Sequence, residues 1–80
     1  MNNIEEIIKI IRDEASMTIE PDTEITSDTD LISDLHIDSL DMMLIIGDIE
    51  QKFDIVIDNT EIQNVRTVKD IANKISEMKS

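Results

Sequence analysis

Several residue types are scarce or missing in this chain, and each absence excludes a class of protein. None of the 80 residues is cysteine, which excludes disulfides, cysteine-ligated zinc and a thiol nucleophile. No apolar run approaches the roughly 20 residues of a membrane span, and charges interrupt the N-terminal isoleucines, so no signal peptide is predicted. We therefore expect a soluble, cytoplasmic protein with a single domain over residues 1–80.

Basic residues are also few. Seven Lys and Arg stand against nineteen Asp and Glu, which gives a formal net charge of −12 at pH 7. Nucleic acids and anionic membrane surfaces would be repelled by such a chain. We expect a monomer whose partners are proteins with basic surfaces.

What the chain does contain is isoleucine at helical spacing. An i, i+3, i+4, i+7 stripe predicts a helix over residues 3–16, and a second helix is predicted to begin at Asp38 or Ser39, with Asp41 completing a capping-box-like pair. A last helix is predicted to open with the similar pair Thr67 and Asp70. The three stripes are Ile4, Ile7, Ile8, Ile11 and Ala15; Met42, Ile45, Ile46, Ile49 and Phe53; and Val68, Ile71, Ala72, Ile75 and Met78.

The segments between these stripes are irregular. Residues 17–37 hold Pro21 and many Thr, Ser and Asp residues, which predicts a long loop pinned to the core by isolated apolar residues, with a turn of helix near residues 30–33. "DIVID" alternates like a strand but has no partner strand, so we expect an extended connector with Ile55 and Ile57 inward. A short helix is predicted over 58–63. The fold class is all-α: a small bundle of three main helices plus one short helix, with a long loop between the first two.

The second helix carries more apolar residues than one buried face needs. The apolar residues outside its core stripe are Leu40, Met43, Leu44 and the single glycine, Gly47. On a helical wheel they lie away from that stripe, bordered by Asp41, Asp48 and Gln51, which predicts an exposed apolar patch on this helix.

The stretch "DLHIDSLDMMLIIGDIEQKFDIVI", followed by "VRTVKDIANKI", resembles an acyl carrier protein in the order and spacing of its motifs. The Asp-Ser-Leu triplet, the Phe-Asp-Ile-x-Ile ending and the Thr-Val-x-Asp-Ile opening carry the likeness, which extends from Ile4 to Ile75. The resemblance implies that Ser39 receives 4′-phosphopantetheine from coenzyme A through a separate phosphopantetheinyl transferase. The thiol of this arm would then carry acyl groups, with fatty-acid biosynthesis as the expected pathway, so the protein would not be an enzyme.

In this family the second helix and the loop before it dock onto basic patches of the transferase and of acyl-processing enzymes. The resemblance assigns docking to Asp38, Leu40, Asp41 and Met43, and the predicted apolar patch with its border adds Leu44, Gly47 and Asp48. Two residues depart from the family pattern: His36 stands where glycine is usual, and Leu44 where fatty-acid carriers have glutamate. A specialised carrier for polyketide, nonribosomal peptide or other secondary-metabolite synthesis is therefore the alternative.

Three unrelated functions would use the same residues. A calcium-binding EF-hand loop starting at Asp28 would need glycine at Ser33 and glutamate at Ser39, and has neither. A serine hydrolase would pair His36 with Ser39 but lacks the Gly-x-Ser-x-Gly elbow. A non-covalent acidic adaptor would use the same docking face without any modification.

Overall fold

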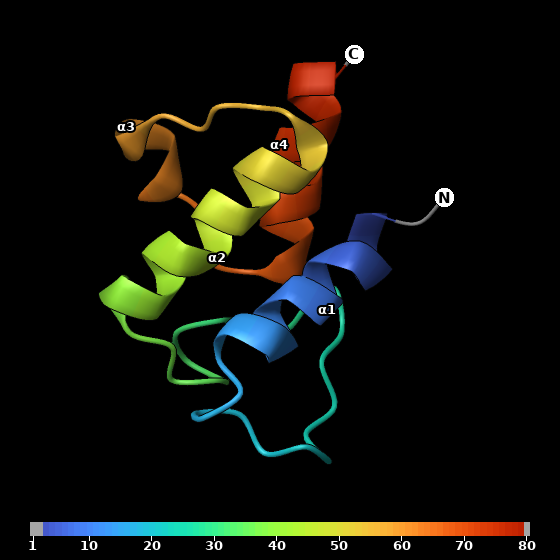
Figure 1. Ribbon diagram of the computed structural model, residues 1–80, viewed down its shortest axis with the longest axis vertical. Helices are drawn as coiled ribbons and strands as arrows, with labels where there is room; N and C mark the ends of the chain where they lie inside the picture. The colour runs from blue at the N-terminus through green and yellow to red at the C-terminus, as the bar shows by residue number, and fades with distance from the viewer. Residues whose placement is uncertain (1–2, 80) are drawn as a thin grey trace.

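The computed structural model describes residues 3–79, which form four helices and no strand, in agreement with the all-α prediction. The helices are α1 (Asn3–Glu14), α2 (Ser39–Phe53), the short α3 (Asn59–Ile62) and α4 (Val68–Lys79). Helix α1 packs against both α2 and α4, and the long loop between α1 and α2 closes one end of the bundle (Figure 1). No helix within residues 3–79 is long and apolar enough to cross a bilayer.

The predicted stripes form the core with few exceptions. Isoleucine supplies most of the buried apolar side chains, and Ile7, Ile45 and Ile71 from the three main helices are fully buried. Phe53 is only partly buried at the end of α2, and Met78 was wrongly placed in the core, because it is exposed on the last turn of α4. The core therefore consists of aliphatic side chains, most of them isoleucine, with little aromatic filler.

Helix α1 ends two residues before its predicted boundary. The Ala15 amide still donates to the Ile11 carbonyl, but residues 15–18 close turns on the Ala15 carbonyl and do not continue the helix. The Arg12 side chain then ties the start of the loop to the helix by donating to the carbonyls of Thr23 and Pro21.

The loop over 17–37 is pinned as predicted by Ile19, Ile25, Leu31 and Leu35, all of which are buried. The helical turn expected near 30–33 is instead a set of hydrogen-bonded turns, in which the Asp34 amide donates to the Asp30 carbonyl. Ile32 also departs from the expectation, since it is exposed. The polar side chains of this segment satisfy its amides locally, so no regular helix forms.

The loop also pairs with the segment that precedes α4. Asp30 and Thr67 form an isolated bridge, and the Leu31 amide donates to the Arg66 carbonyl at 2.7 Å. The Val68 amide donates to the Thr29 carbonyl. These bonds bring residues 30–33 beside Arg66, although the two segments are more than 30 residues apart in the sequence.

The remaining connections follow the prediction. Ile55 and Ile57 are buried in an extended segment after α2, and the Glu50 carboxylate accepts the Ile57 amide at 2.8 Å. At the start of α4, Thr67 and Asp70 exchange hydrogen bonds of 3.1 Å in both directions, so the predicted capping box is present.

Candidate functional site

Ser39 occupies the first position of α2 and is exposed. Asp38 caps the helix from an extended backbone conformation, and its carboxylate accepts the Asp41 amide at 2.8 Å. The Met42 amide donates to the Asp38 carbonyl at 2.9 Å. The serine hydroxyl thus stands at the positive end of a helix dipole, where an anionic group on it is favoured.

The chain before α2 holds this serine outside the core. Leu35 and Ile37 are buried on either side of His36, whose side chain is exposed. The Ile37 amide donates to the Leu31 carbonyl at 3.0 Å, and His36 takes the left-handed conformation with φ 58°. This sharp reversal turns the chain from the buried loop to the exposed start of α2.

A cavity of about 360 Å³ opens beside Ser39. Its lining is mainly apolar and comes from three parts of the chain: the loop before α2, the first turns of α2, and the segment from α3 to α4. The residues are Ile32, Ile37, Asp38, Ser39, Met42, Met43, Ile62, Gln63, Val65 and Arg66. An apolar chain attached through Ser39 would find shelter from water here.

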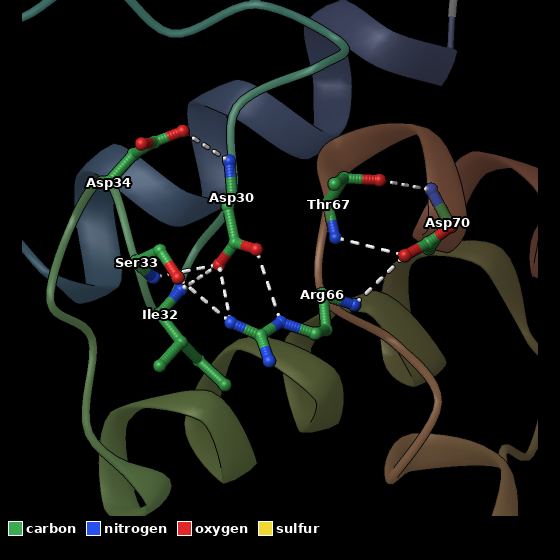
Figure 2. Close-up of polar contacts among 7 residues, drawn as sticks. All are labelled: Asp30, Ile32, Ser33, Asp34, Arg66, Thr67 and Asp70. Atoms are coloured by element: carbon green, nitrogen blue, oxygen red, sulfur yellow. Dashed lines mark hydrogen bonds and ion pairs between the residues drawn. The ribbon is translucent and has the colours of Figure 1, made fainter.

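A polar network borders this cavity (Figure 2). Arg66 Nε donates to Asp30 Oδ2 at 3.1 Å, and its Nη2 donates to Ser33 Oγ at 2.9 Å. The Asp30 carboxylate also accepts the amides of Ser33 and Ile32, and these bonds, together with Arg66, hold its pKa below the usual value. The loop before α2 is thereby fastened to the segment before α4.

The apolar patch predicted on α2 is exposed. Leu40 and Met43 are each 68% exposed and Leu44 is 50% exposed, while Gly47 leaves the helix surface bare. Asp41 and Asp48 lie half-buried at its border. The patch and the Ser39 hydroxyl are thus presented by the same helix.

Two of the alternative readings find no support in this geometry. Among the hydrogen bonds of residues 3–79, none joins His36 to Ser39, so a proton relay is not assembled. The described residues gather no cluster of three or more acidic or histidine side chains suited to a metal ion.

Comparison with known proteins places this arrangement in a family. The family model described as "Phosphopantetheine attachment site" matches residues 5–75. An acyl carrier protein of Rickettsia bellii is 36% identical over 81 residues, which cover 100% of this chain and 91% of that protein. The chain belongs to the acyl carrier protein family. A further relative, from Coprothermobacter proteolyticus, is 35% identical over 71 residues, covering 89% of this chain and 83% of its own.

The fold also matches that of a solved structure. A solved Mycobacterium tuberculosis structure, assigned as an acyl carrier protein, superposes with a TM-score of 0.81 at 31% identity, covering 92% of this chain and 95% of that one. Members of this family carry acyl groups on phosphopantetheine and are carriers, not catalysts. An exposed serine at a helix start, beside a mainly apolar cavity, fits such an arm.

Sequence reasoning missed part of the lining of the cavity. Ile62, Val65 and Arg66 line it together with Ile32, and none of them was singled out as a site residue. Ile32 and Ile62 break the core pattern by remaining partly exposed, and Arg66 is one of few cations in an acidic chain. Those two features were the available signals, but neither indicates which surface the residues share.

Proposed function

We propose that Ser39 is the attachment residue and that the protein carries acyl intermediates for fatty-acid biosynthesis. In the attachment step, Ser39 Oγ loses its proton and bonds to the phosphorus that bears pantetheine in coenzyme A. The pyrophosphate P–O bond breaks, and adenosine bisphosphate leaves with the electron pair. The bound arm supplies the thiol for thioester formation, which explains why the chain needs no cysteine of its own.

One observation carries this proposal: the exposed Ser39 at the first position of α2 borders a mainly apolar cavity. The helix dipole favours the phosphate, and the cavity offers room for an acyl chain. Asp38 and Asp41 oppose the phosphate by like-charge repulsion, so the attraction of the helix dipole for the phosphate is partly offset.

We also propose α2 as the docking face for a phosphopantetheinyl transferase and acyl-processing enzymes with basic patches. The exposed Leu40, Met43, Leu44 and Gly47 would contact the partner, and Asp38, Asp41 and Asp48 would attract its basic residues. A monomeric, cytoplasmic carrier with one domain over residues 1–80 completes the proposal.

A specialised carrier is the second candidate, because Leu44 and Gly47 make this face more apolar and less acidic than in fatty-acid carriers. The pathway is tested by presenting the modified protein to acyltransferases of fatty-acid synthesis. Loading at a rate similar to that of an established fatty-acid carrier would support the first candidate, and no loading would favour the specialised one.

Attachment is tested by mass spectrometry after incubation with coenzyme A and a broad-specificity transferase. The expected gain is about 340 Da in the wild type and none in Ser39→Ala. Ser33→Ala is the matched control, since Ser33 is an exposed serine near the same cavity, and it should keep the full gain. Modification that persists in Ser39→Ala would contradict the assignment.

Three further measurements, made beside the mass analysis, separate the unrelated functions. A calcium-dependent rise in melting temperature without any mass gain would indicate a metal site. Ester hydrolysis by the unmodified protein would indicate a hydrolase, and binding to a basic partner without modification would indicate an adaptor.

A further inference from the structure

Arg66 is the one cationic side chain that lines the Ser39 cavity within residues 3–79. It lies on the segment before α4 and lines the same cavity as Asp38 and Ser39 at the start of α2. The backbone amide of Arg66 donates to Asp70 Oδ2 at 3.0 Å, which joins it to the capping box of α4. Its backbone position is therefore fixed by the start of a helix.

The guanidinium is also held along one edge. Nε and Nη2 point at Asp30, with distances of 3.1 and 3.4 Å to its two oxygens, and Nη2 also reaches Ser33. Asp30 is itself fixed by the amides of Ile32 and Ser33. These contacts set the plane of the Arg66 guanidinium before any ligand is present, which lowers the entropy lost when a ligand binds.

The other edge of the guanidinium is unused. Figure 2 shows the third nitrogen, Nη1, pointing away from Asp30 without a dashed line to any of the residues drawn. The hydrogen bonds of residues 3–79 include none from Arg66 Nη1, and the side chain is half-exposed. The bonds to Asp30 use only one edge of the guanidinium, and the two N–H groups of Nη1 remain as donors beside the cavity.

We infer that Arg66 binds the phosphodiester of the arm and holds the arm against the cavity, an inference that rests on the proposed attachment at Ser39. A phosphodiester carries one negative charge, and hydrogen bonds from arginine to such oxygens are charge-assisted. Asp38 lies in the same cavity wall and Asp41 one turn into α2, and both repel this charge. Arg66 lines the same cavity and compensates that repulsion with its positive charge.

The chain offers a direct spectroscopic test, because it contains two arginines, Arg12 and Arg66. The proton–nitrogen correlation spectrum of the labelled protein should therefore show two arginine Nε–H signals, assigned with Arg12→Gln and Arg66→Gln. Attachment of the arm should shift the Arg66 signal and leave the Arg12 signal in place. Arg12 contacts carbonyls of the loop and does not line this cavity, so it is an internal control.

A second readout observes the arm. The phosphorus NMR signal of the modified protein should move in Arg66→Gln and stay unchanged in Arg12→Gln. Asp30→Asn is the control for a purely structural role of Arg66. It weakens the link between the loop and the segment before α4, but the phosphorus signal should stay close to its wild-type position.

The outcomes distinguish this inference from the proposed function. A complete mass gain with an unmoved Arg66 signal would overturn the role of Arg66 and leave attachment at Ser39 intact. Equal phosphorus shifts in Arg66→Gln and Asp30→Asn would reduce Arg66 to a structural residue and would also refute it. If no mass gain occurs at Ser39, both proposals fall together.

Discussion

His36 and Asp54 are two non-glycine residues with left-handed backbone conformations, at φ 58° and 56°. Asp54 ends α2, where a left-handed residue is common. His36 lies in the turn before the cap of α2, at the position where the family usually has glycine. The structure explains that preference, since glycine adopts this conformation without the steric cost that a Cβ brings.

We predict that substitutions at His36 change stability through the backbone. His36→Gly should raise the free energy of unfolding by about 0.5–1 kcal/mol, because relief of strain exceeds the added freedom of the unfolded chain. His36→Val should lower it by about 1–2 kcal/mol, since a β-branched residue tolerates positive φ poorly. Urea denaturation measures both changes, and equal stability of the two variants would contradict the interpretation.

Gly47 has no such conformational requirement. It lies within α2, and a Cβ built there meets nothing within 4 Å. We predict that Gly47→Ala raises the free energy of unfolding by about 0.5–1 kcal/mol, because alanine restricts the unfolded chain and favours the helix. Thermal and urea unfolding give the measurement. A loss of stability would contradict the open space found around Gly47.

At the scale of elements, α2 has two faces with different tasks. Met42, Ile45, Ile46 and Ile49 are buried, whereas Leu40, Met43 and Leu44 are exposed. The run of five apolar residues from Met42 to Ile46 thus serves both the core and the surface. This arrangement supplies the patch proposed for docking without weakening the packing of α2 on α1.

We predict that charge on α2 controls docking more than equal charge elsewhere. Asp41→Lys with Asp48→Lys should lower the transferase kcat/KM by about tenfold or more, because a basic partner then meets like charge. The control is Glu5→Lys with Glu6→Lys on α1. Each pair of substitutions reverses two acidic charges and changes the net charge by +4, from −12 to −8. Similar losses from both pairs would refute α2 as the docking face.

At the scale of the whole molecule, the net charge of −12 opposes the compact state. We predict that raising sodium chloride from about 10 to 150 mM raises the melting temperature by a few degrees, as the Debye length falls from about 30 to 8 Å. The Asp41→Lys, Asp48→Lys variant should respond less, because it carries less excess charge. An increase of equal size in both proteins would count against self-repulsion as the cause.

The fold raises the pKa of some acidic side chains and lowers that of others. Desolvation and the nearby Asp48 raise the pKa of Glu14, so the folded state binds this proton more tightly and gains stability as pH falls through the raised pKa. The pKa of Asp30 is lowered by the Ser33 amide and Arg66, and that of Asp70 by the amides of Arg66 and Thr67. The stability that Asp30 and Asp70 contribute is fully present above their pKa values in the unfolded chain. It is lost as the pH falls through their lowered pKa values in the folded protein.

We therefore predict a stability maximum at mildly acidic pH. Glu14→Gln should raise the melting temperature at pH 7 and have little effect below the raised pKa of Glu14, where the wild-type carboxyl is already protonated. Melting curves over a pH series measure this difference. A Glu14→Gln effect that does not vary with pH would contradict the electrostatic explanation.

The amino-acid sequence by itself determined the helices, the core stripes and the serine at the start of α2. These features are local: apolar spacing defines each buried face, and Asp38, Thr67 and Asp70 mark helix starts within one turn. The family motifs lie in the same continuous stretches, so Ser39 could be proposed before any fold was known.

Only the tertiary structure decided which residues share a cavity with that serine. Arg66 reaches the cavity because the Leu31 amide bonds to its carbonyl and Asp30 bonds to its side chain, across more than 30 residues of sequence. The exposure of Ile32 and the left-handed conformation of His36 also appear only in the structure. Spacing along the chain reports which face of one helix is apolar, but it does not report which loop will close over that face.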